Sequence, residues 1–372
     1  MRRIAKKPSH LLDLRSGCLV LLCMSSCVLA GQPAPAAQVA RTKAEVDALI
    51  AKAGATPPDW FAATPLNYPN TLDLTWAKAP PKSPWTPSKW LGQYIFSVIN
   101  ENPGKWKEGV KLMHHVLEVN KADKEKLQQT MKALAAMYQN LLQDHARAAF
   151  WLRKAEVDAT DGWAVDLATC YWKLGNKDMA VELLKKIGDD DTRHGGVIKL
   201  WADLGETATA LKVAEAKAKD GDGYMAWLMA GEACRIAGRN KEALDYYERV
   251  LKEPGENKGD IKQSRERAKA SIEALKVYDL LDLKRIPDGT YTSTSYGYAG
   301  PITVAVTTKA SKITSVKVTQ HHEKQYFASL TDTPQRIIDK QSIKGIDTFS
   351  SATITSEAII NATAKALSSG MK

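Results

Sequence analysis

Cysteine is scarce in this chain, and tryptophan is missing from its C-terminal part. Of the five cysteines only Cys170 and Cys234 follow residue 30, and no tryptophan follows Trp227. We expect both thiols to be buried and unpaired, because they fall on separate predicted helices and a disulfide needs Cα atoms within about 7 Å. The chain has no Cys-x-x-Cys-His sequence for haem and no cysteine cluster for an iron–sulfur centre. A redox function would therefore need another cofactor.

Long apolar runs and basic runs with interleaved aromatics are also missing. Residues 1–30 combine a basic start with an apolar core too short for a comfortable membrane span, and they end in the small-residue pattern Val28-Leu29-Ala30. This pattern predicts an export signal. Five basic residues and one acidic residue lie within it, so the net charge falls from +10 to +6 without it. We expect no nucleic-acid partner.

The export signal predicts a periplasmic or otherwise extracytoplasmic protein. An alternative is a lipoprotein, because Met24-Ser25-Ser26-Cys27 resembles a lipobox with an imperfect first position. Lipid on Cys27 would make the chain membrane-associated.

Composition divides the rest of the chain into three parts. Residues 31–87 are a Pro/Trp-rich leader, interpreted either as an extended segment whose Trp rings plug the following helices or as a partner-binding segment. Residues 88–284 read as pairs of helices, the last a charged helix over 259–283. Residues 285–372 change to alternating Thr, Val and Ile, which predicts strands.

The helix pairs share a spacing of a Gly, a small residue five positions later and a larger or apolar one nine later. It occurs at Gly175/Ala180/Leu184, Gly205/Ala210/Ala214 and Gly238/Ala243/Tyr247, with weaker copies at Gly104/Gly109/Met113 and Gln143/Ala148/Leu152. The pattern resembles tetratricopeptide repeats, which implies a concave groove that would dock a redox partner protein. Five tryptophans could line this groove or fill the core between repeats: Trp151, Trp163, Trp172, Trp201 and Trp227.

The C-terminal part is predicted to be α+β. Alternation over residues 290–298, 302–306 and 313–319 indicates a three-stranded antiparallel sheet. Thr333-Pro334 is typical of an N-cap and first helical residue, which predicts a helix to about residue 343. A last amphipathic helix begins at about Thr355, with Glu357, Asn361 and Lys365 as its polar stripe.

Hydroxyl side chains are dense in residues 347–356, just before that last helix. Ser and Thr favour helix N-caps, so the run could be a simple cap. It could also hold a phosphate near Thr353, because a helix N-terminus offers free N–H groups and the positive end of the dipole. Lys340 or Lys344 could add neutralising charge.

The order of motifs from Asp288-Gly289-Thr290 through Tyr296-Gly297-Tyr298 to residues 347–356 resembles the FMN-binding domain family, including the flavin subunits of the sodium-pumping NADH:quinone reductase and the Rnf complex. The family signature, Asp-x-x-Ser-Gly-Ala-Thr-x-Thr-Ser, implies FMN joined by a phosphoester to Thr353, installed by a flavin transferase that uses FAD and magnesium. The resemblance implies further cofactor-binding residues at Asp347, Ser350, Ser351, Ala352, Thr355, Ser356, Glu323 and Tyr298.

One residue and one four-residue loop depart from the pattern of the family. Ser351 stands where the family has Gly, and His321-His322-Glu323-Lys324 stands where its best-known members have Glu-Thr-Pro-Gly. Neighbouring histidines on a strand point to opposite faces, so we predict no metal site.

The sequence therefore predicts a multi-domain protein, with an all-α tetratricopeptide-like array followed by a small α+β FMN-binding domain. We expect an exported electron carrier with no catalytic residues of its own. The alternatives are a non-catalytic scaffold with a degenerate FMN-binding domain and a periplasmic flavin-dependent reductase component.

Overall fold

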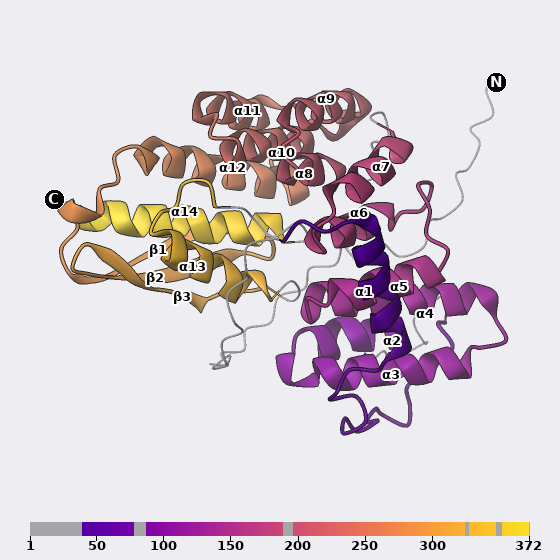
Figure 1. The fold of residues 1–372 in the computed structure, drawn as a ribbon. Coiled ribbons are helices and arrows are strands. Elements are labelled where there is room, and N and C mark those ends of the chain that lie inside the picture. The colour runs from indigo at the N-terminus through magenta and orange to yellow at the C-terminus, as the bar shows by residue number, and fades with distance from the viewer. Residues whose placement is uncertain (1–38, 78–86, 189–195, 324–326, 347–351, 372) are drawn as a thin grey trace. The chain divides into compact units, whose positions relative to one another are not determined.

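The computed structural model describes residues 39–77, 87–188, 196–323, 327–346 and 352–371 (Figure 1). The first part of the chain forms the helices α1 (Lys43–Ala55), α2 (Leu91–Tyr94), α3 (Trp106–Val119), α4 (Lys124–Ala136), α5 (His145–Lys154), α6 (Ala164–Lys173), α7 (Lys177–Ile187), α8 (Gly196–Asp203), α9 (Thr207–Lys217), α10 (Gly223–Ile236), α11 (Asn240–Lys252) and α12 (Gly259–Tyr278). After them come the strands β1 (Gly289–Tyr296), β2 (Pro301–Lys309) and β3 (Lys312–Gln320), then the helices α13 (Ser329–Lys340) and α14 (Thr353–Gly370). The predicted fold class is confirmed: a helical array precedes a small α+β region.

The repeated glycines have the same backbone geometry at each turn. Gly175, Gly205 and Gly238 have φ of +94°, +81° and +73°, where a side chain would be strained. Each donates its N–H to the carbonyl three residues back, and the next residue donates to the carbonyl five back. This is the Schellman turn that ends a helix. The spacing in the sequence thus corresponds to one turn used three times.

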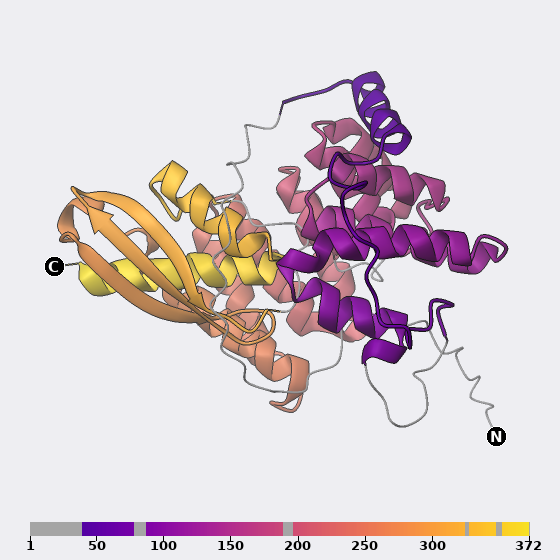
Figure 2. The ribbon, with the colours of Figure 1, turned by 90° about the horizontal axis from the view of Figure 1, so that it is seen from below.

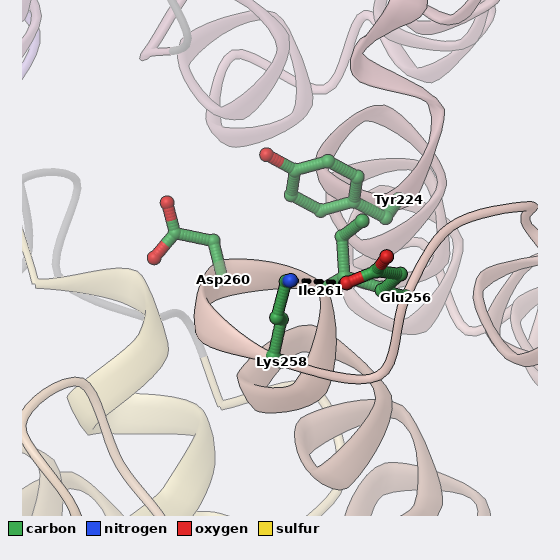
Figure 3. A pocket seen from close by; sticks show the side chains of 5 residues that line it. All are labelled: Tyr224, Glu256, Lys258, Asp260 and Ile261. Atoms are coloured by element: carbon green, nitrogen blue, oxygen red, sulfur yellow. Dashed lines mark ion pairs between the residues drawn. The ribbon is translucent and has the colours of Figure 1, made fainter.

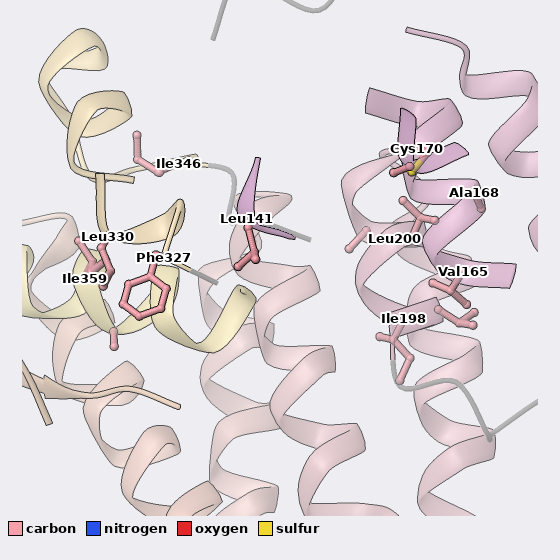
Figure 4. Packing of buried hydrophobic residues seen from close by; sticks show 14 of the residues in the cluster. Leu141, Val165, Ala168, Cys170, Ile198, Leu200, Phe327, Leu330, Ile346 and Ile359 are labelled. Atoms are coloured by element: carbon pink, nitrogen blue, oxygen red, sulfur yellow. The ribbon is translucent and has the colours of Figure 1, made fainter. Parts of the chain in front are cut away.

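The residues that follow these turns pack tightly. Ala180, Ala210 and Ala243 have no exposed surface, as small residues at close helix crossings require. Cys170 and Cys234 are buried free thiols, as predicted. Trp151 and Trp201 are also buried and belong to the core. Figure 4 shows part of this core, where Val165 and Ala168 of α6 lie beside residues of α8.

The leader contains a helix that was not predicted, α1. Thr42 and Glu45 form a capping box at its start, a signal that was present in the sequence. Farther along, the indole N–H of Trp76 donates to the hydroxyl of Thr130 in α4 at 2.7 Å, and Lys107 of α3 lies over the ring of Trp60. These contacts agree with a leader whose rings lie against the following helices. Residues 78–86 fall outside the described residues.

The sheet has the order β1-β2-β3 and is antiparallel throughout, as predicted. Burial alternates along β2, with Ile302, Val304, Val306 and Thr308 inside. This alternation gives the sheet one covered face, against which α13 and α14 pack (Figure 2). Phe327, Leu330 and Ile359 join the apolar layer between them (Figure 4).

The helix α13 begins at Ser329, so the predicted N-cap at Thr333 is wrong. Thr333 is buried with 1% of its surface exposed, and Pro334 lies inside the helix. Leu330 in the added turn is buried in the core. Packing of this turn against the domain therefore extends the helix before its proline.

Two of the three residues in the polar stripe of α14 do not face solvent, which corrects the expectation of a simple amphipathic helix. Glu357 and Asn361 are 5% and 2% exposed. Both face the array, where Glu357 accepts hydrogen bonds from the Tyr247 hydroxyl at 2.5 Å and the Ser271 hydroxyl at 2.9 Å. The Asn361 amide donates to the same Ser271 at 3.0 Å. The helix is thus covered by the sheet on one side and by α12 on another, and Tyr247 of α11 reaches it through the hydrogen bond to Glu357.

Candidate functional site

Thr353 is the first residue of α14, two positions earlier than the predicted helix start. It is half-buried, and the preceding Ala352 supplies no side-chain cap. The 18-residue helix therefore directs its first N–H groups and the positive end of its dipole at this position. Thr355 and Ser356 point inward and are 1% and 0% exposed. The predicted site residues Asp347, Ser350 and Ser351 lie outside the described residues.

Glu323 follows β3 and is buried, with 4% of its surface exposed. Its Oε1 accepts hydrogen bonds from the backbone N–H groups of Tyr298 at 2.9 Å and Ala299 at 3.2 Å. Burial raises the pKa of the Glu323 carboxyl above its ordinary value, whereas these amides, the nearby Thr355 hydroxyl and the charge of Arg267 lower it. The structure thus brings three predicted site residues together: Glu323, Tyr298 and Thr355.

The turn between β1 and β2 is shaped to receive this carboxylate. Gly297 donates its N–H to the carbonyl of Gly300 at 2.8 Å, and Gly300 has φ of +147°. A Cβ on Gly297 would lie 2.7 Å from Glu323 Oε1 and 2.5 Å from Ile302 Cδ1. Only glycine fits at Gly297 without displacing the carboxylate.

Arg267 is a site residue that the sequence analysis missed. It lies on α12, is 6% exposed, and donates to the carbonyl of Tyr298 at 3.0 Å and more weakly to that of Gly297 at 3.4 Å. Burial lowers the pKa of the guanidinium, and the negative charge of Glu323 counteracts this effect. The available signal was a single arginine on a face of small residues, between Ser264 and Ser271.

Two buried polar atoms at this site lack hydrogen-bond partners among the described residues. They are Glu323 Oε2 and the hydroxyl of Thr355. The hydroxyl stabilises the charged form of the carboxylate by proximity, although the two do not meet hydrogen-bond geometry. Buried polar atoms without partners carry a cost that a polar ligand would remove. FMN, with its phosphate, hydroxyls and ring carbonyls, has the donor and acceptor groups to fit.

Three other side chains of the domain have different partners. Phe327 is 7% exposed and packs on the ring of Trp106, with 5.9 Å between ring centroids, so it belongs to the core. Lys344 forms an ion pair with Asp279 at 2.7 Å, and Lys340 donates to the carbonyl of Gly345 at 3.0 Å. Among the described residues, neither lysine has a contact that directs it to Thr353.

A second buried charged cluster lies on the array side of α14. The guanidinium of Arg235 in α10 pairs with Glu232 at 2.7 Å, and both are almost fully buried. Burial, followed by the charge of Glu232, raises the pKa of Glu357 to about 8, whereas Arg235 and the hydroxyls of Tyr247 and Ser271 act in the opposite direction. Burial thus favours the protonated form of the Glu357 carboxyl.

Two cavities open on the array. One is lined by Tyr224, Glu256, Lys258, Asp260 and Ile261 (Figure 3). The other is lined by Glu215, Ala218, Lys219, Trp227, Arg249 and Glu253. Both cavities are open to solvent, and none of their lining residues has a buried polar atom without a hydrogen-bond partner. The unpartnered atoms of Glu323 and Thr355 therefore identify the candidate flavin site better than cavity volume does.

The described ranges contain neither a candidate metal site nor a candidate membrane span. No group of three or more His, Cys, Asp or Glu side chains in these ranges could hold a metal ion. Within the same ranges, no helix has the length and apolar character needed to cross a membrane.

The comparison with protein families gives one match. The model of the FMN-binding domain matches residues 297–368. This stretch begins at Gly297 in the turn between β1 and β2 and ends in the last turn of α14. No curated protein and no solved structure matches the chain. Residues 297–368 are thus an FMN-binding domain, which implies FMN as cofactor and a flavin-based role in electron transfer. The match does not extend over the helical array.

Proposed function

We propose that this chain is an exported flavoprotein that carries FMN through a phosphoester on Thr353 and transfers electrons to or from a docked partner. The observation that carries the proposal is the position of Thr353. Within the stretch matched as an FMN-binding domain, Thr353 is the first residue of a long helix, so its hydroxyl lies at the helix N-terminus. A phosphate attached there would be stabilised by the helix N–H groups and dipole.

The residues around Thr353 support a bound flavin. Glu323 Oε2 and the Thr355 hydroxyl are buried polar atoms without hydrogen-bond partners in the described part of the chain, and Tyr298 lies on the turn that Glu323 holds. When bound, FMN supplies the exchange of one or two electrons, while the protein supplies orientation and electrostatics. Loading would need a flavin transferase, since phosphoester formation is a phosphoryl transfer that depends on positioning.

The array is the proposed docking surface for a redox partner, in keeping with its likeness to tetratricopeptide repeats. Trp227 is half-buried, as Trp163 and Trp172 are, and it also lines a cavity with Arg249 and Lys219. Its ring stacks on Tyr246 at 5.9 Å, and Arg249 lies over both rings. Export under the signal in residues 1–30 remains part of the proposal, and lipid on Cys27 remains its alternative.

Co-expression with a flavin transferase tests the attachment. The wild-type chain should gain the mass of FMN less one water, and the denatured band should fluoresce. Thr353→Ala should lose both signals, because it removes the acceptor oxygen, whereas Thr353→Ser should keep them.

Thr331→Ala, on the exposed face of α13, is the matched control and should be loaded like the wild type. Added mass on Thr353→Ala would show that another residue is the acceptor. A wild-type chain that binds no flavin, covalently or otherwise, would favour the scaffold alternative.

A further inference from the structure

The helical array contributes a charged residue to the FMN-binding domain. Arg267 belongs to α12, 30 residues before the matched stretch begins at Gly297, yet it lies against that stretch. Its Nη2 donates to the carbonyl of Tyr298 and to the side chain of Gln263 at 3.2 Å. Gln263 lies one turn earlier on α12, so the guanidinium is held in place from its own helix.

Arg267 and Glu323 hold the two sides of the same turn. The cation binds the carbonyls of Gly297 and Tyr298, and the anion binds the amides of Tyr298 and Ala299. Both side chains are more than nine-tenths buried. The turn peptides therefore lie between opposite charges in a region shielded from water.

Each of the two charged side chains has one polar atom that could still bind a ligand. Glu323 Oε2 is buried without a hydrogen-bond partner among the described residues. Arg267 uses Nε and Nη2, and its Nη1 makes no hydrogen bond within the same ranges. The Thr355 hydroxyl, also buried and without a partner there, lies beside the carboxylate. An available donor, an available acceptor and a hydroxyl thus share one site two residues from Thr353.

Buried charges act strongly on a neighbouring redox group, because little solvent screens them. A cation stabilises the added negative charge of a reduced flavin, and a carboxylate destabilises it. The carboxylate of Asp260, two helical turns earlier on α12, also acts on the charge of Arg267. It lines the open cavity of Figure 3, where water screens this electrostatic effect.

We infer that Arg267 of α12, paired across the 297–299 turn with Glu323, sets the redox potential of the bound flavin, so that the array completes the flavin site. The inference rests on the proposed function only in requiring that FMN is bound, by whatever linkage. It assigns Arg267 and Glu323 as positioning and charge-setting residues of opposite effect.

Spectroelectrochemical titration of the full-length, flavin-loaded protein tests this inference. Arg267→Gln should lower the flavin midpoint potential. At the wild-type midpoint, the ratio of reduced to oxidised flavin should fall about tenfold, which is ~30 mV for a two-electron couple. Arg267→Lys should recover most of this shift, because it keeps the charge without the fork of donors. Glu323→Gln should raise the potential at about pH 8, where an ordinary carboxyl is ionised.

Arg265→Gln is the matched control. It removes the same charge two residues away, where the guanidinium binds the carbonyl of Glu253 in the loop before α12. Its potential should equal that of the wild type.

The inference is overturned if flavin-loaded Arg267→Gln protein has the wild-type midpoint potential. It is also overturned if the midpoint potential of Arg267→Lys is shifted as far as that of Arg267→Gln. If Arg267→Gln does not fold, Glu323→Gln decides, and an unchanged potential in that variant overturns the inference. Absence of flavin from the wild-type chain refutes the proposed function and the inference with it. A loaded wild type with unshifted variants refutes the inference alone.

Discussion

At the scale of single residues, Glu357 shows how a carboxyl group can be kept inside a protein. It lies one helical turn after Thr353 and is surrounded by the hydroxyls of Tyr247 and Ser271 and by the Arg235–Glu232 ion pair. Every one of these neighbours comes from the array. Burial makes the neutral acid the favoured form, and the protonated carboxyl can donate a hydrogen bond as well as accept one.

This environment predicts a loss of stability as the pH rises. The unfolded chain releases the Glu357 proton near its ordinary pKa of 4.5, whereas the folded protein holds it until about pH 8. Between these values the folded state binds more protons, so the free energy of unfolding falls by about 1.4 kcal/mol per pH unit for this group. Glu357→Gln removes the titration and should flatten this decline, as measured by urea unfolding at several pH values.

Glu273→Gln provides a control for that pH series, because Glu273 forms an exposed ion pair with Lys365 on the same pair of helices. Its unfolding curve should keep the wild-type dependence on pH. An unaltered slope in Glu357→Gln would mean that this carboxyl is ionised in the folded protein.

Residues near in sequence to a recognisable motif could be predicted, and those from distant segments could not. Glu323, Tyr298 and Thr355 were proposed from the family resemblance and lie together. Arg267 could not be found this way, because its role comes from folding of α12 against a turn 30 residues away. No local pattern encodes that contact.

At the scale of elements, the glycines at the helix turns show how much stability depends on backbone conformation alone, apart from side-chain packing. Gly205 has φ of +81°, and a Cβ there would meet nothing within 4 Å. Gly205→Ala should therefore destabilise the protein by about 1 kcal/mol through conformation alone. Urea unfolding followed by tryptophan fluorescence measures this change.

Gly104→Ala is the comparison, since that glycine has equally open space but no positive φ. Its stability should stay within about 0.5 kcal/mol of the wild type. Equal losses in both variants would contradict a conformational origin.

The type and order of elements were largely predictable, because strand alternation and glycine-marked helix pairs are local signals. The start of α13 was not, since Thr333-Pro334 has the local chemistry of a helix start but packing adds the turn that contains Leu330. The polar stripe of α14 was misread for a similar reason. Hydrophobic periodicity identifies a polar face, but not whether water or a second layer of polar side chains covers it.

At the scale of the whole molecule, Ala34–Lys372 form one compact unit in which α14 links the sheet to the array. The hydrogen bond from Tyr247 to Glu357 spans 110 residues of sequence. Removing the Tyr247 hydroxyl leaves a buried acceptor on α14 as well as a smaller side chain on α11. The two helices should therefore lose stability together.

Hydrogen exchange tests this coupling. Tyr247→Phe should lower the protection of amides in both α11 and α14 by about 1–3 kcal/mol. Tyr246→Phe is the adjacent control, because Tyr246 stacks on Trp227 within the array. Protection lost in α11 but retained in α14 would contradict the link.

The burial of Glu357 between α14 and the array also constrains how this protein can change in evolution. Its hydrogen-bond partners Tyr247 and Ser271 lie 110 and 86 residues before Glu357, outside the stretch that matches the FMN-binding family. An acid at position 357 is tolerable only while those hydroxyls persist, so the three positions should covary among homologous chains. Transplanting residues 297–368 onto another array would carry a buried carboxyl without its partners, and helices α11 and α12 would have to be inherited with it.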